Sequence, residues 1–193
     1  MSPTAQDSPG PILVTGPSRS GKSEWAEHLA LNRDRPITYI ATALKDPDDP
    51  EWQARLQAHR DRRPNTWQTV EAPHDLAIAL AQIPSDRDIL LDSLGTWVAN
   101  HLELTNEPWL EQQKNLIDAL RQVGDRAIIV AEETGWGVVP AYPLGRKFRD
   151  RLGHLTRTIA RHSSRVFLVV AGYAIDLKQQ GHLVPNLESS AIY

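Results

Sequence analysis

The chain lacks several features that mark common classes of protein. It contains no cysteine, which excludes disulfide bonds, thiolate metal ligands and a cysteine nucleophile, and which fits a reducing compartment. No apolar run approaches the ~20 residues that a membrane-spanning helix needs. With 21 Lys and Arg against 24 Asp and Glu, the formal net charge of -3 gives no general attraction to nucleic acid. We therefore expect a cytoplasmic protein that has no membrane span and no nucleic-acid partner.

The most informative segment that is present is Gly16–Ser23, which fits the phosphate-loop pattern G-x-x-x-x-G-K-[ST]. An apolar run precedes it and an amphipathic pattern follows, in the strand–loop–helix order that such a loop requires. Backbone amides of this loop would bind phosphate oxygens, Lys22 would attract the β- and γ-phosphates, and the Ser23 hydroxyl would ligate Mg²⁺. The expected nucleotide-binding residues are Gly16, Pro17, Ser18, Arg19, Ser20, Gly21, Lys22 and Ser23.

Short apolar runs alternate with helical patterns along the 193 residues, which predicts one α/β domain with a mostly parallel sheet. We expect a three-layer P-loop NTPase of the RecA-like kind over residues 11–178. Residues 1–10 are predicted to be a disordered leader and residues 179–193 a C-terminal tail. The expected strands cover 11–15, 37–41, 67–70, 88–92, 127–131 and 165–170, and the expected helices 24–31, 51–61, 76–83, 96–104, 109–123 and 144–162.

Carboxylates follow two of the predicted strands, at the sheet edge where ligands bind in such folds. Asp92 closes one strand, where it would position Mg²⁺ or, alternatively, cap the next helix. Glu132 and Glu133 close another. Because neighbouring residues of an extended chain point to opposite faces, only one of these two is expected in the site, and we favour Glu133.

Two groups of basic side chains leave alternatives open. His59 lies among arginines on a predicted helix, where it is either solvated or a nucleophile that attacks phosphorus. Arg146 and Arg149 share a helix face at i, i+3 spacing, so they either face solvent or clamp a phosphate. Spacing alone does not choose between these interpretations.

Taken together, the motifs resemble the bifunctional adenosylcobinamide kinase/adenosylcobinamide-phosphate guanylyltransferase family of cobalamin biosynthesis. The resemblance runs from about Ile12 to Lys178, in the family's order. It rests on the phosphate loop, Tyr39–Ala43, Glu51, Arg55, His59-Arg60, Arg63-Pro64, Trp67, Thr69, Leu90–Leu94, Trp97, Asn100, Glu133–Pro140, Arg146, Phe148–Asp150, Gly153 and Val169–Gly172.

The resemblance implies two reactions that use GTP or ATP with Mg²⁺. The hydroxyl of the aminopropanol arm of adenosylcobinamide accepts a γ-phosphoryl group, and GMP is then transferred from GTP to adenosylcobinamide phosphate through an enzyme histidine. His59 takes that histidine's position, with Lys22 as the second catalytic residue. Arg60, Glu71 and Asp92 join the nucleotide site, Glu133, Arg146 and Arg149 are substrate candidates, and a homo-oligomer, a trimer, is implied.

The chain also departs from the family. The family usually has Asn-Glu where this chain has Glu132-Glu133, and often Asn-Gln where it has Thr156-Arg157. Two other functions stay open at this point: a single-activity kinase for another small molecule, and a GTP-binding module without an acceptor. The chain has no N-K-x-D segment for reading guanine, which argues against the module.

Overall fold

The computed structural model describes residues 9–46 and 48–185, so most of the predicted leader and part of the predicted tail lie outside the described residues. A seven-stranded sheet has the order β3-β2-β4-β5-β1-β6-β7, and it is parallel apart from β7, which pairs antiparallel with β6. The predicted α/β class with a mostly parallel sheet is confirmed. The strands are Ile12–Gly16 (β1), Ile37–Ala41 (β2), Gln68–Glu71 (β3), Asp88–Asp92 (β4), Ala127–Glu132 (β5), Arg165–Val170 (β6) and Tyr173–Asp176 (β7).

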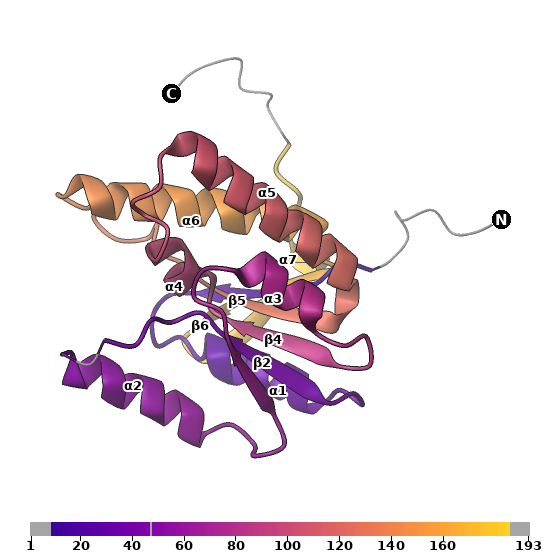
Figure 1. The fold of residues 1–193 in the computed structure, drawn as a ribbon. Helices are drawn as coiled ribbons and strands as arrows, with labels where there is room; N and C mark the ends of the chain where they lie inside the picture. The colour runs from indigo at the N-terminus through magenta and orange to yellow at the C-terminus, as the bar shows by residue number, and fades with distance from the viewer. Residues whose placement is uncertain (1–8, 47, 186–193) are drawn as a thin grey trace.

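Helices cover both faces of this sheet, but unequally (Figure 1). One face packs against α1, and the other packs against α3, α4, α5 and α6. Within the described residues, no helix combines the length and apolar character needed to cross a bilayer. The helices are Lys22–Leu31 (α1), Pro50–Asp61 (α2), Leu76–Gln82 (α3), Leu94–Ala99 (α4), Asn106–Val123 (α5), Pro143–His162 (α6) and Leu177–Gln180 (α7), with a 3₁₀ turn at Gly124–Arg126.

Alternation along the central strands produces two separate cores. Leu13 packs toward α3–α6 and Val14 toward α1, and Ile129 and Val130 divide in the same way. All four side chains are fully buried. Because both faces are covered, these strands read as continuous apolar runs, which is why the sequence locates them well.

Two features of the fold, strand β7 and the end of α4, could not be recognised in the sequence. Strand β7 has only four residues, too few for a recognisable pattern, and it is defined by its antiparallel pairing with β6. Helix α4 ends at Ala99, although apolar periodicity predicts a helix to residue 104. The Asn100 side chain donates to the carbonyls of Thr42, at 2.8 Å, and Pro73, at 2.9 Å, which holds the chain away from a further helical turn.

Arg151 binds two backbone carbonyls in the turn that follows α4. Its guanidinium donates to the carbonyl of His101 at 2.8 Å and to that of Leu104 at 2.7 Å, and it lies 4.7 Å from the centre of the Trp109 ring. The residue is only 7% exposed. Arg151 therefore links α6 to the turn after α4 and to α5.

We expect Arg151→Ala to lower the free energy of unfolding by about 3 kcal/mol, because it removes two charge-assisted hydrogen bonds and the packing of the guanidinium on the Trp109 ring. Arg121→Ala is the control, since the Arg121 side chain is 54% exposed and pairs with Asp118 on the surface. That change should cost about 0.5 kcal/mol or less. Urea unfolding followed by circular dichroism measures both, and equal effects would contradict the structural role of Arg151.

Candidate active site

The phosphate loop connects β1 to α1 at the carboxyl edge of the sheet. Arg19 and Gly21 adopt left-handed backbone conformations, with φ of 59° and 95°, and these bends close the loop over the start of α1. A side chain at Gly16 would place its Cβ 2.2 Å from the carbonyl oxygen of Val169, so only glycine fits between β1 and β6. Lys22 and Ser23 begin the helix, each 7% exposed. Backbone conformation and close packing therefore define the shape of the loop.

Asp92 lies at the end of β4, on the face of the sheet that carries α1. Its Oδ2 accepts a hydrogen bond from the Tyr39 hydroxyl at 3.0 Å. Burial raises the pKa of Tyr39 well above its usual 10.0, so the phenol keeps the proton that it donates. Ser93, not Asp92, caps α4, because its side chain accepts from the amide of Thr96. The capping alternative for Asp92 therefore does not apply.

Glu132 ends β5 directly beside Gly16, its register partner on β1. Its Oε1 accepts from the Ser93 hydroxyl at 2.6 Å, and its Oε2 accepts from the amide of Gly95 at 2.8 Å. Burial raises the pKa of Glu132 and nearby Asp92 adds to this, while the Ser93 hydrogen bond and Lys22 lower it. A carboxylate held on two sides thus borders the phosphate loop.

His59 reaches the same region from α2, which lies apart from the other helices in Figure 1. Asp49 caps this helix by accepting from the amide of Trp52 at 2.9 Å, and Pro50 occupies its first turn. Trp52, Leu56 and His59 follow one another at spacings of four and three residues, so they share one face of α2 and line a pocket. The helix thereby presents its histidine to the sheet edge.

The Nδ1 atom of His59 lies near two groups that favour different tautomers of the ring. An Arg62 guanidinium nitrogen lies 3.2 Å away, and Asp92 Oδ2 lies 3.9 Å away. A neutral ring that accepts from Arg62 at Nδ1 carries its proton on Nε2, whereas a ring that donates to Asp92 carries it on Nδ1. Arg62 also pairs with Glu24 at 3.1 Å and Glu27 at 3.2 Å on α1. The tautomer of His59 is therefore coupled to the position of Arg62.

One pocket brings most of these side chains together. It joins the phosphate loop, the ends of β2, β4 and β5, and the inner face of α2, and its lining carries charges of both signs. Its lining includes Lys22, Ser23, Tyr39, Ala41, Ala43, Trp52, Leu56, His59, Arg63, Asp92, Ser93, Thr96 and Glu132.

Comparison with known proteins identifies the family of this chain. A family model described as cobinamide kinase / cobinamide phosphate guanyltransferase matches residues 12–177. This chain belongs to that family. The bifunctional adenosylcobalamin biosynthesis protein CobP of Pseudomonas aeruginosa is 39% identical over 168 residues, which cover 86% of this chain and 96% of the relative. The corresponding CobU proteins of Salmonella typhimurium and Escherichia coli are 37% and 35% identical, each over 86% of this chain and 99% of the relative.

Family membership confirms the expected P-loop NTPase fold and the expected enzyme class. The chain is a bifunctional transferase of cobalamin biosynthesis, a cobinamide kinase and cobinamide-phosphate guanylyltransferase that uses a nucleotide substrate. The two other functions that the sequence left open are set aside by this result.

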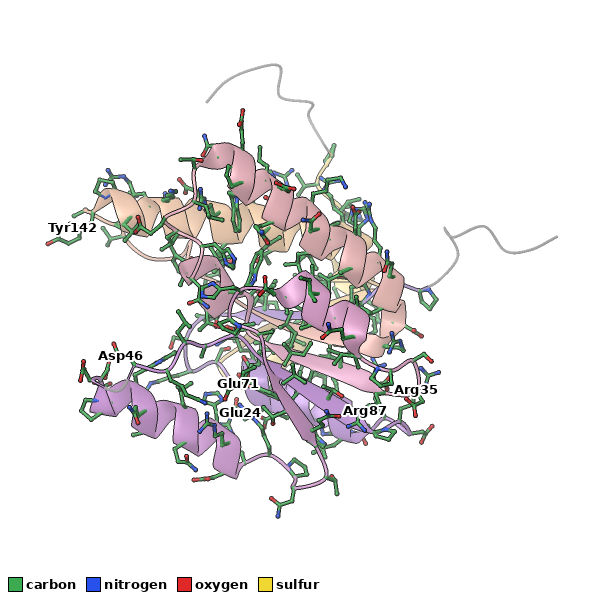
Figure 2. The ribbon with its side chains drawn as sticks, in the orientation of Figure 1. Glu24, Arg35, Asp46, Glu71, Arg87 and Tyr142 are labelled. Atoms are coloured by element: carbon green, nitrogen blue, oxygen red, sulfur yellow. The ribbon has the colours of Figure 1, made fainter. Side chains whose placement is uncertain are left out.

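Other predicted site residues lie outside this pocket. Glu71 pairs with Lys45 at 2.6 Å and with Arg60 at 3.5 Å, and the Lys45 hydrogen bond lowers the pKa of Glu71. Figure 2 shows Glu71 and Glu24 on the side of the sheet that faces α2. Arg60 lines a separate hollow on α2 with Gln53 and Gln57. Arg60 and Glu71 therefore flank the pocket without lining it.

The substrate candidates occupy the region between β5 and α6. Glu133 Oε1 accepts from the amide of Gly135 at 2.7 Å, which shapes the following turn. Arg146 donates to the carbonyls of Pro140, at 2.9 Å, and Ala141, at 2.7 Å, and so does not extend toward the phosphate loop. Arg149 contacts only its neighbour Asp150 at 3.3 Å among the described residues. Of the two adjacent glutamates, Glu132 rather than the favoured Glu133 lies in the pocket with Lys22.

Sequence reasoning assigned no role to Tyr39 and Arg63, which line the pocket, or to Arg62, which lies beside His59. Tyr39 was placed on a strand without a role, yet it orients Asp92. Arg62 and Arg63 follow His59, and the Arg63 guanidinium lies 3.4 Å from the centre of the Tyr39 ring. The run of arginines after His59 is the one signal that the sequence offered, and it does not reveal which of them reaches the sheet.

The oxygen atoms around the loop fit Mg²⁺. The described part of the chain has no group of three or more His, Cys, Asp or Glu side chains that would bind a metal by themselves, but Mg²⁺ does not require one. Mg²⁺ is bound in such sites by one or two protein oxygens together with substrate phosphates and water. The Ser23 hydroxyl and the Asp92 carboxylate supply protein oxygens of this kind in one pocket. The remaining ligands would come from the nucleotide.

We expect Glu132→Gln to become more stable relative to the parent chain as the pH rises. Because burial raises the pKa of Glu132 above its usual 4.5, the folded state favours the protonated carboxyl. That stabilisation is complete below the usual pKa and is lost as pH rises through the raised pKa, whereas glutamine stays neutral.

Urea unfolding from about pH 4 to about pH 7.5 tests this expectation. Glu111→Gln, at an exposed position of α5, is the matched control and should show a constant difference from the parent. A stability difference for Glu132→Gln that does not change over this range would contradict the expectation.

Proposed function

We propose that both reactions use the single nucleotide pocket formed by the phosphate loop and the inner face of α2. The observation that carries this proposal is the position of His59, which lines the same pocket as Lys22 and Ser23 and lies 3.9 Å from Asp92. A histidine on a solvated helix face would point to water and would not line the same pocket as a phosphate loop. Both ATP and GTP fit the phosphate chemistry of the loop.

In the kinase reaction, the loop amides and Lys22 hold the triphosphate and neutralise the charge that develops as the γ-phosphoryl group leaves. Ser23 and Asp92 would hold Mg²⁺, which supplies further charge neutralisation between the phosphates when bound. The acceptor hydroxyl forms a bond to the γ-phosphorus, the bond to the β-phosphate oxygen breaks, and the nucleoside diphosphate leaves.

In the transferase reaction, a ring nitrogen of His59 attacks the α-phosphorus of GTP and pyrophosphate leaves, which forms a phosphoramidate. The acceptor's phosphate oxygen then attacks the same phosphorus, and the histidine leaves with its ring neutral again. Arg62 supports this sequence, because a guanidinium that moves from His59 Nδ1 to a phosphate would free the lone pair for attack.

Acceptor binding, assembly and location complete the proposal. Glu133, Arg146 and Arg149 are the proposed acceptor contacts, while Arg60 and Glu71 are proposed to border the nucleotide. Exposed apolar residues between β5 and α6 support a homo-oligomer, which we propose to be a trimer, and Tyr142 stands at the outer end of α6 (Figure 2). A cytoplasmic location is proposed from the absence of cysteine and the need for nucleotide. The exposed apolar residues on which the homo-oligomer proposal rests lie between β5 and the first turn of α6: Trp136, Val138, Val139, Tyr142 and Leu144.

Incubation with GTP labelled on the α-phosphate should leave acid-labile, base-stable label on the chain, and His59→Ala should lose it by at least ~100-fold because the nucleophile is gone. His154→Ala, at an exposed histidine of α6, should retain the label. Denaturing gel electrophoresis measures both. If His59→Ala were labelled as strongly as the parent chain, the histidine intermediate would be wrong.

Lys22→Ala should weaken binding of GTP and ATP about 10- to 100-fold, since it removes a charge-assisted contact to the phosphates. Titration calorimetry in the presence of Mg²⁺ measures the dissociation constants. Lys114→Ala is the control, because the Lys114 side chain is 75% exposed and pairs only with Asp118 among the described residues. Unchanged affinity in Lys22→Ala would remove the basis for nucleotide binding at this loop.

A further inference from the structure

A second cavity of about 260 Å³ lies next to the nucleotide pocket, between α6 and the segment that follows β5. It sits at the carboxyl ends of β1 and β5, where ligands of open α/β sheets bind. Figure 1 shows α6 and α1 on opposite sides of the sheet, so the two cavities approach its edge from opposite faces. Residues that matter for the argument are Thr15, Glu133, Arg149, Gly153, Thr156 and Arg157.

Hydrogen-bonding groups in this cavity are left unsatisfied by the protein. The hydroxyl oxygens of Thr15 and Thr156 are buried, and neither has a partner among the described residues. Thr15 is 8% exposed, so solvent does not compensate for the missing hydrogen bond. Buried polar atoms normally find partners, so these two hydroxyls are available to hydrogen-bond with water or with a polar ligand in the cavity.

Charge and size restrict what that molecule can be. Arg149 and Arg157 provide positive charge on one wall, and Glu132 and Glu133 provide carboxylates on the other. Sites for a whole drug-sized ligand enclose ~300–1,000 Å³, so this cavity admits a short polar arm but not a macrocycle. A hydroxyl suits the carboxylate wall, and a phosphate suits the arginine wall.

Glu132 lines both cavities and so stands between them. Its carboxylate is held by Ser93 and Gly95, each through a different oxygen. A carboxylate offers about four lone-pair positions, so it can accept a further hydrogen bond from a molecule in the second cavity.

Building on the proposed function, we propose that the second cavity binds the aminopropanol arm of the acceptor and that Glu132 accepts the proton of its hydroxyl during phosphoryl transfer. The corrin ring then stays outside the cavity. The hydroxyl oxygen bonds to the γ-phosphorus, its proton passes to Glu132, and the bond between the γ-phosphorus and the β-phosphate oxygen breaks. After phosphorylation, Arg149 and Arg157 hold the new phosphate.

Gly153→Leu tests the cavity without disturbing the helix. Gly153 lines the cavity, and a Cβ there meets no atom within 4 Å, so a leucine side chain has room to occupy the cavity; leucine also favours helix more than glycine does. We expect the KM for adenosylcobinamide to rise at least ~10-fold, with labelling of the chain by GTP within about twofold of the parent. His154→Leu, one position along α6, is the matched control and should behave like the parent.

An unchanged KM in Gly153→Leu would overturn the assignment of the cavity. Equal loss of labelling by GTP would also overturn it, because the block would then not be confined to the acceptor. Failure of the parent chain to become labelled would instead count against the histidine step, and the KM comparison would still test the cavity.

Glu132→Gln tests the proton acceptor. The kinase kcat should fall at least ~100-fold, the range expected for loss of a general base, while transfer of GMP to preformed adenosylcobinamide phosphate continues, because that acceptor is already ionised. Glu132→Asp keeps a carboxylate and should recover part of the kinase rate, and Glu111→Gln should change neither reaction. A kinase kcat within about threefold of the parent, or an equal loss of both reactions, would refute the role of Glu132.

Discussion

Parallel pairing of β5 with both β4 and β1 is the constraint on which the rest of the site depends. Val130 on β5 is the register partner of Asp92, and Glu132 is the register partner of Gly16, so three strands end together at one edge. The buried faces of β5 hold this register, because a shift by one residue would move its apolar side chains to the opposite core. Lys22, Asp92 and Glu132 meet as a consequence.

Helix α2 is held in a different way. Its histidine reaches the site through charged and aromatic contacts, from Arg62 to Glu24 and Glu27 and from Arg63 to Tyr39, rather than through either apolar core. Surface ion pairs contribute little stability and rearrange easily. The phosphate loop follows a buried strand of the sheet, whereas the proposed nucleophile stands on an element held largely by charged contacts. A triphosphate is the kind of ligand that would change those contacts.

Features encoded within a few residues could be predicted well. The bounds of β2, β4 and β6 agree with the apolar runs, and the Asp49-Pro50 start of α2 follows from capping and proline preferences. The early end of α4 and the pairing of β7 could not, because both depend on partners distant in the chain. For the same reason the sequence could not predict that Glu132 rather than Glu133 lies in the pocket with Lys22, whereas family membership followed from many motifs in order.

By itself, the sequence determined the phosphate loop, the α/β architecture and the family, because each depends on residue types at short, regular spacing. Only the tertiary structure decided which side chains meet. It brought His59 to within 3.9 Å of Asp92, selected Glu132 for the pocket with Lys22, and left a second cavity between β5 and α6. Those outcomes depend on strand order and helix docking, which join residues far apart in the chain and leave no local pattern from which to predict them.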